Sequence, residues 1–172
     1  MNKVKIIDYI PEHQPYFEFF NRMWIEKYFR MEPEDEYVLT NPEDAIIESG
    51  GIILMATYDG HLAGTVALKK LGDTTYEFTK MAVHENFHRK GIAEELSYGA
   101  FRKAYELGAE KIILYTNSIL KPAIRLYEKL GFHHEELEKG RYKRADVKMG
   151  ISMEQILKET MFFTITTQEI NI

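Results

Sequence analysis

The sequence lacks several features that would assign it to common functional classes. It contains no cysteine in 172 residues, which excludes disulfide bonds, thiolate metal ligands and a cysteine nucleophile. No run of 18 apolar residues is present, and residues 1–8 are too short and too charged for a signal peptide. Neither a GxxxxGK[ST] phosphate loop nor a GxGxxG dinucleotide fingerprint occurs.

The charge balance points away from nucleic acids. The 27 acidic and 22 basic residues give a formal net charge of −5, and no basic face is evident that could neutralise phosphates. The length and the hydrophobic content of 45% suit one well-packed domain. We therefore expect a single-domain cytoplasmic protein with neither a nucleic-acid nor a membrane partner.

The most informative stretch is a strand, a loop and a helix that follow one another near the middle of the chain. Residues 76–83 are rich in β-branched and aromatic side chains, and apolar residues recur every three or four positions along residues 92–107. A turn that opens a helix exposes unpaired N–H groups where the helix dipole favours negative charge. In this turn Gly91 leaves room for a ligand, and Arg89 and Lys90 add positive charge. The stretch predicts a site for phosphate or pyrophosphate.

Hydrophobic periodicity and turn residues predict the remaining elements. Strands are expected at residues 4–9, 52–58, 62–70, 111–116, 132–138 and 145–152. Helices are expected at residues 12–29, 41–50 and 122–130, with an acidic connector at residues 31–36. A strand, a helix and a strand in that order imply a right-handed crossover and a parallel pair of strands, which would leave a slot if they splay apart.

Three segments together resemble the GCN5-related N-acetyltransferase (GNAT) family. They are residues 77–83, the loop His-Arg-Lys-Gly-Ile-Ala at residues 88–93, and Ala-Ile-Arg-Leu-Tyr-Glu-Lys-Leu-Gly-Phe at residues 123–132. The resemblance implies an α/β fold with a mixed, mostly antiparallel sheet of six or seven strands, helices on both faces and a central splayed parallel pair. It also implies acetyl coenzyme A (acetyl-CoA) as cosubstrate. The coenzyme contacts that it implies are Met81, Ala82, Val83, His88, Arg89, Lys90, Gly91, Ile92, Ala93, Asn117 and Ser118.

Two positions depart from the family pattern. His88 stands where the family has Gln or Arg, so a side-chain contact there would come from an imidazole. Leu120 replaces a common asparagine, and its polar contact would be absent or shift to Asn117. The backbone cradle does not depend on either side chain. His84 and His88 flank a loop without a third ligand at a recognised spacing, so we expect no metal.

Two side chains are candidates for catalysis. Tyr127 resembles the tyrosine that family members place near the coenzyme sulfur, where its hydroxyl could protonate the departing thiolate. A core tyrosine is the alternative. Glu77 resembles the glutamate that serves some members as a base through water, and a polar residue on the exposed face of a strand is its alternative. Backbone N–H groups at Met81 or Ala82 could polarise the thioester carbonyl.

The acceptor region is expected at the N-terminal side of the chain. The helix at residues 12–29 is unusually aromatic, and Trp24 and Tyr28 could line the acceptor pocket or simply anchor the core. Eight acidic residues lie between Glu26 and Glu48, where they could steer a cationic amine or form a solvated loop.

Together these patterns predict an acetyl-CoA-dependent N-acetyltransferase that acts on a small-molecule or peptide amine. A non-catalytic sensor or interaction module that binds acyl-CoA is the alternative. Residues 1–153 are expected to form the GNAT-like domain, and residues 154–172 an extension that could add a strand at residues 161–167 or mediate a homodimer.

Overall fold

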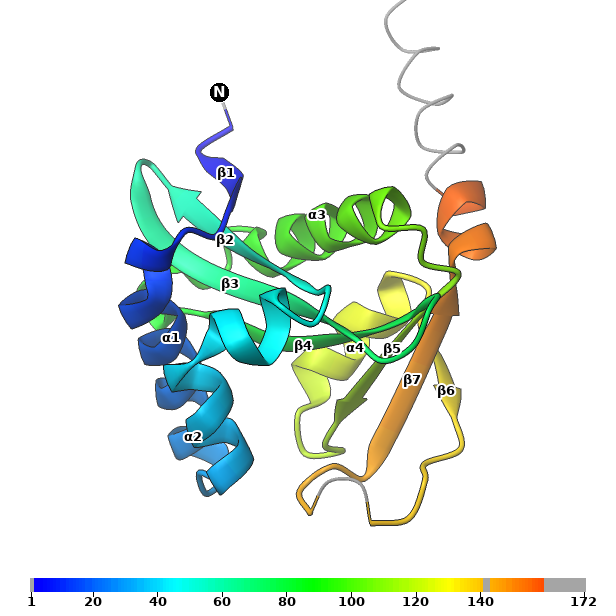
Figure 1. The fold of residues 1–172 in the computed structure, drawn as a ribbon. Helices are drawn as coiled ribbons and strands as arrows, with labels where there is room; N and C mark the ends of the chain where they lie inside the picture. Colours follow the sequence, from blue (N-terminus) through cyan, green and yellow to red (C-terminus); the bar gives the residue numbers. More distant parts are fainter. Residues whose placement is uncertain (1, 141–142, 160–172) are drawn as a thin grey trace, which may run out of the picture.

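A seven-stranded sheet with helices on both faces forms the protein (Figure 1). The computed structural model describes residues 2–140 and 143–159. The strands are β1 (Val4–Asp8), β2 (Ile52–Tyr58), β3 (His61–Lys70), β4 (Thr75–Val83), β5 (Lys111–Thr116), β6 (His133–Glu135) and β7 (Val147–Ser152), in the order β1-β2-β3-β4-β5-β7-β6. The helices are α1 (Gln14–Tyr28), α2 (Pro33–Thr40), α3 (Ile92–Glu106) and α4 (Lys121–Lys129). Short helical turns are η1 (Pro11–His13), η2 (Glu43–Ile47) and η3 (Glu85–Phe87).

Two hydrophobic cores sandwich the sheet. The first joins the sheet to α3 and α4, through residues such as Leu96 and Leu130. The second joins it to α1 and α2, through residues such as Phe17 and Leu39. Figure 1 shows α3 on one side of the sheet and α1 with α2 on the other. Because strand side chains alternate between faces, a stretch of strand buried on both faces is apolar, as β2 is from Ile52 to Ala56.

The parallel pair predicted at the centre of the sheet is present and it splays. β4 and β5 pair at Thr75–Lys111, Tyr76–Ile112 and Glu77–Ile113. Beyond Glu77 the structure gives no further pairing between them, although β4 continues to Val83 and β5 to Thr116. The other strand pairs are antiparallel. The sheet is therefore open between β4 and β5 at the end where the two helices α3 and α4 meet it.

β4 carries a β-bulge just after the splay begins. Thr65 and Ala67 of β3 pair with Ala82 and Thr79 of β4, so three steps along β4 face two steps along β3. Lys80 within the bulge has a φ of 53°, in the left-handed region that a non-glycine residue seldom adopts. Because of the extra residue, the side chains of β4 beyond the bulge point to the opposite face of the sheet from the one that strict alternation would give. The bulge also takes backbone groups of β4 out of the regular hydrogen-bonding pattern with β3.

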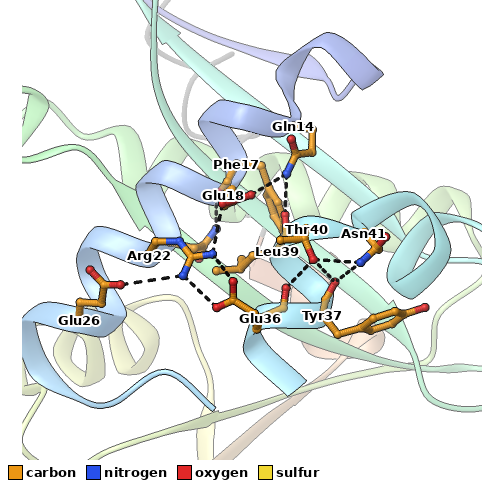
Figure 2. Close-up of polar contacts among 11 residues, drawn as sticks. Gln14, Phe17, Glu18, Arg22, Glu26, Glu36, Tyr37, Leu39, Thr40 and Asn41 are labelled. Atoms are coloured by element: carbon orange, nitrogen blue, oxygen red, sulfur yellow. Dashed lines mark hydrogen bonds and ion pairs between the residues drawn. The ribbon is translucent and has the colours of Figure 1, made fainter. Parts of the chain in front are cut away.

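An ion-pair cluster on the outer surface fixes α2 against α1 (Figure 2). The Arg22 guanidinium donates to both carboxylate oxygens of Glu36 on α2, at 2.9 and 2.8 Å, and also contacts Glu18 and Glu26 on its own helix. Gln14 donates to the backbone carbonyl of Leu39 at 2.9 Å. These contacts hold the helix that carries Asp35 over the end of β4.

The sequence prediction was wrong about residues 31–36, which are not a connector. α2 begins at Pro33, because the backbone N–H of Glu32 donates to the Asp35 carboxylate and acidic side chains fill the first turn, where the helix dipole favours negative charge. The short helix expected at residues 41–50 is the π-type turn η2, and β6 and β7 are shorter than the predicted hairpin. Residues 153–159 are helical, and the predicted strand at residues 161–167 lies outside the described residues. Within the described chain no helix is long and apolar enough to cross a membrane.

Candidate active site

Two adjoining cavities lie where the sheet opens. The first, here called the loop cavity, has a volume of about 530 Å³ and is bounded by α1, the end of β4, the loop before α3, the first turn of α3, and α4. The second, here called the ionic cavity, lies between α1, α2, the bulge of β4, the end of β5 and residues 144–145. Both are lined by Trp24, Met81, Leu120, Ala123 and Tyr127. The cavities therefore meet along a shared wall that contains Tyr127.

The loop cavity ends at the N-terminus of α3. Gly91 is the N-cap of this helix and has a φ of 75°, which favours glycine. A Cβ atom built on Gly91 would have no protein atom within 4 Å, so the space beside the exposed N–H groups of the first turn is open. Arg89 in the same turn also has a positive φ, of 63°. This geometry suits a phosphate held by backbone N–H groups.

Most of the coenzyme contacts predicted from sequence line this cavity. They are Met81, Ala82, Val83, His88, Arg89, Gly91, Ile92 and Ala93. The imidazole Nε2 of His88 lies 2.9 Å from the carbonyl oxygen of Val83, so this side chain braces the loop against the end of β4.

Three predicted contacts lie elsewhere. The Lys90 ammonium lies 5.1 Å from the centre of the Tyr58 ring. Ser118 donates to the Asp146 carboxylate from its backbone N–H and its hydroxyl, at 2.7 and 2.6 Å. Asn117 lines the ionic cavity and donates to the backbone carbonyl of Arg144 at 2.6 Å. Asn117 and Ser118, in the turn after β5, thus hold the loop before β7 in place. The spacing of the sequence motif does not indicate this structural role.

Tyr127 stands at the junction of the cavities with its ring packed edge-on against Phe78 and Phe132. Its side chain is buried, with 9% of the residue exposed, and burial raises its pKa to about 12. The group is thus a protonated phenol at neutral pH that lines both cavities.

Glu77 is buried and faces the ionic cavity, so it is not a residue on an exposed strand face. It is 4% exposed, and it is the last residue of β4 that pairs with β5. Its cross-strand partner on β3 is Lys69, which lines the same cavity. The splay of the strands is what gives the Glu77 carboxylate access to this space.

A charged cluster that motif reasoning missed forms the far wall of the ionic cavity. Arg144 binds both oxygens of Asp35, with Nη2 at 2.7 Å from Oδ1, and the Lys80 ammonium lies 3.1 Å from the same oxygen. The backbone N–H of Glu32 donates to Asp35 Oδ2 at 3.0 Å. Burial alone would raise the pKa of Asp35, but the Arg144 hydrogen bonds and the Lys80 charge hold it well below its usual range. The one feature of the sequence that could have drawn attention to Asp35 is its place in the first turn of a helix, three residues after Glu32.

The two aromatic residues predicted to line the acceptor pocket, Trp24 and Tyr28, differ in the cavities that they line. Trp24 lines both cavities, whereas Tyr28 lines the loop cavity and is half exposed. Their rings contact one another with centroids 6.0 Å apart. His84 stacks on Phe19 and accepts the N–H of Asn86, and no group of three potential metal ligands occurs among residues 2–140 and 143–159.

Known proteins are similar to this chain in both sequence and fold. The sequence profile of the Acetyltransferase (GNAT) family matches residues 15–132. The uncharacterized N-acetyltransferase YvbK of Bacillus subtilis is 30% identical over 107 residues, which are 60% of this chain and 69% of YvbK. N-acetylaspartate synthetase of Homo sapiens is 34% identical over 86 residues, which are 49% of this chain and 28% of that protein.

A solved structure shows the same fold. The acetyltransferase YncA from Salmonella typhimurium, determined with its cofactor acetyl-CoA, superposes with a TM-score of 0.69 over 88% of this chain and 95% of YncA, at 18% identity. The profile match covers more than half of the chain, and it includes β4, the loop before α3 and all of α4. The chain therefore belongs to the GNAT family of acetyltransferases, enzymes that use acetyl-CoA.

Proposed function

We propose that this protein transfers the acetyl group of acetyl-CoA directly to the amine of a small-molecule or peptide acceptor. The observation that carries the proposal is the meeting of the two cavities at Tyr127, with Glu77 in the ionic cavity beyond it. The loop cavity would hold the coenzyme and the ionic cavity the acceptor.

The residues of the loop cavity fit acetyl-CoA. The open space beside Gly91 and the N-terminus of α3 suit the pyrophosphate, since backbone N–H groups there are available to an anion. The loop cavity extends between the end of β4 and α4 to Tyr127, which suits an extended arm with the thioester at its tip. When bound, the coenzyme supplies an activated acyl carbonyl and a thiol leaving group.

Glu77 and Tyr127 would handle the two protons that acetyl transfer moves. As the bond between nitrogen and the acyl carbon forms, the amine loses a proton, and Glu77 can accept it directly or through water. As the bond between that carbon and sulfur breaks, the thiolate needs a proton, and Tyr127 can donate it because its raised pKa keeps it protonated. Backbone N–H groups at the β4 bulge, at Met81 or Ala82, would polarise the carbonyl.

Replacing Glu77 with Gln tests this assignment, because the change keeps size and removes the basic site. We expect Glu77→Gln to lose rate at neutral pH and to recover at alkaline pH, where more of the acceptor amine is already unprotonated, since an alkylamine titrates near about 10. Coenzyme A affinity measured by calorimetry should stay unchanged. The matched control is Glu48→Gln, an exposed residue outside both cavities.

The rates come from coenzyme A release measured with amino acids, peptides and polyamines as acceptors. A Glu77→Gln profile identical to wild type, with chemistry rate-limiting, contradicts the role of Glu77. Tight coenzyme binding without transfer to any amine would instead favour the non-catalytic sensor.

A further inference from the structure

The ionic cavity is lined by charges of both signs. The cations are Lys69, Lys80 and Arg144, and the carboxylates are Glu32, Glu34, Asp35 and Glu77. Glu34 is exposed, which leaves three cations facing three carboxylates deeper in the cavity. Among the described residues the lining thus carries both signs of charge, which suits an acceptor that also carries both signs.

Asp35 has no capacity left for a ligand. Its two oxygens accept two hydrogen bonds from Arg144, one from Lys80 and one from the backbone N–H of Glu32. One carboxylate thus serves two cations, and a second carboxylate, that of Glu32, lies 3.8 Å from Arg144. Glu32 pairs with Arg144, and among the described residues Asp35 is the carboxylate that pairs with Lys80.

Of the two cations, Lys80 is the better placed to bind a ligand. Arg144 already makes the bidentate contact that matches a carboxylate, while Lys80 makes one contact with Asp35 and carries three donors. Its side chain is 14% exposed, so the ammonium is largely removed from bulk water. A largely buried ammonium that shares its carboxylate partner with a second cation favours an anionic ligand group.

The backbone places Lys80 beside the reaction centre. Its φ of 53° is strained for a non-glycine residue, and such strain is concentrated at functional sites. The residue lies three positions after Glu77 and directly before Met81, which lines both cavities. Lys80 and Glu77 line the same cavity, so an anionic group bound by Lys80 would lie in the same space as the proposed base.

We propose, building on the function proposed above, that the acceptor carries a carboxylate close to its reacting amine, as a free amino acid does, and that Lys80 binds this carboxylate. The amine would then lie towards Glu77. Lys80 determines specificity for the anionic group, and the Asp35 cluster holds it in place.

Matched acceptors test the proposal. We would measure acetyl transfer to the standard L-amino acids, to the corresponding L-amino acid amides and to spermidine. At least one amino acid should exceed its amide by tenfold or more in kcat/KM, because the amide keeps the amine and loses the charge. Lys80→Met should raise the KM for that amino acid about tenfold with kcat nearly kept, and should leave the KM for the amide unchanged.

Two further variants control for folding and charge. Lys80→Arg should restore most of the affinity for the amino acid, and Lys5→Met, which removes an exposed lysine on β1, should change nothing. Coenzyme A binding by calorimetry verifies that each variant is folded. A preference for amino acids over amides that survives in Lys80→Met would overturn the role of Lys80.

The outcomes separate this inference from the proposed function. Efficient transfer to amides or spermidine but not to amino acids would overturn the inference and uphold the acetyltransferase. If no amine is acetylated, the proposed function fails, and calorimetry of the amino acids and amides on the coenzyme-A-loaded protein decides the carboxylate site. Selective binding of an amino acid there would uphold the site, and binding of neither kind would overturn it.

Discussion

The loop cavity and the ionic cavity adjoin each other but are built by different means. One end of the loop cavity is a contiguous stretch of chain, where Gly91 and the start of α3 offer backbone groups in fixed geometry. The ionic cavity is assembled from segments far apart in sequence, which side-chain charges join: Arg144 and Asp35 are 109 positions apart, and Lys80 and Asp35 are 45 apart. A site that binds its ligand through backbone groups keeps its affinity when most side chains are substituted. A site made of ion pairs changes its charge and shape with each substitution. The difference suits a shared coenzyme on one side and a particular acceptor on the other.

The largest effect should come from removing the charge of Asp35, which lies at the centre of the ion pairs in the ionic cavity. Asp35→Asn removes the buried countercharge that Arg144 and Lys80 share, which should lower the free energy of unfolding by on the order of 3 kcal/mol at neutral pH. Urea denaturation would measure it. The affinity of the folded variant for coenzyme A should stay near wild type, because the cluster lies outside the loop cavity.

The same variant has a pH signature. The pKa of folded Asp35 lies below its unfolded value of about 3.9, so its stabilising contribution is present above that pH and is lost as the pH falls towards the folded pKa. The stability difference between wild type and Asp35→Asn should therefore be constant near neutral pH and shrink below about pH 4. A difference that does not change with acidification would contradict the ion-pair account.

At the junction of the cavities, Tyr127→Phe removes the hydroxyl and keeps the ring packing against Phe78 and Phe132. We expect kcat to fall on the order of 100-fold, since a positioned acid contributes that much, with coenzyme affinity nearly intact. Steady-state kinetics and calorimetry measure the two quantities. Wild-type turnover in this variant would make Tyr127 a packing residue.

The backbone site should be broken by filling its open space. Gly91→Glu places bulk and negative charge where we expect the pyrophosphate, and should weaken coenzyme A binding by more than tenfold. Gly108→Glu is the matched control at the other end of α3, because Gly108 also has a positive φ, of 79°, and open space beside it. Equal losses in both variants would mean that backbone strain, not the ligand, explains the effect.

The smallest effect is expected outside both cavities. Arg22→Met removes the outer contact between α1 and α2, which is solvent-accessible and therefore weak. The urea midpoint should fall slightly and the KM for the acceptor should not change. A large rise in this KM would show that the outer ion pairs of Figure 2 also position Asp35.

Sequence reasoning located the elements that local signals specify. The strand before the loop, the turn at Gly91 and the limits of β5 follow from β-branched runs, glycine and alternation, which act over a few residues. The role of Asp35 could not be predicted, because its partners lie on β4 and in the loop before β7. The bulge at Lys80 carries no glycine or proline to mark it. Ser118 was expected near the coenzyme because of its position after β5, but it caps the loop before β7 through Asp146.

β4 and β5 pair through only three residue pairs among the described residues, which has a consequence for the cooperativity of unfolding. β1 to β4 form one antiparallel unit, and β5, β7 and β6 form another, so the sheet is divided at its centre. Amide groups at this seam have fewer backbone partners than those inside either unit, and they should exchange with solvent hydrogen earlier than the strand interiors. A ligand that lies between β4 and β5 binds the two units together. Saturating coenzyme should therefore slow exchange at the seam more than elsewhere and make thermal unfolding more nearly two-state.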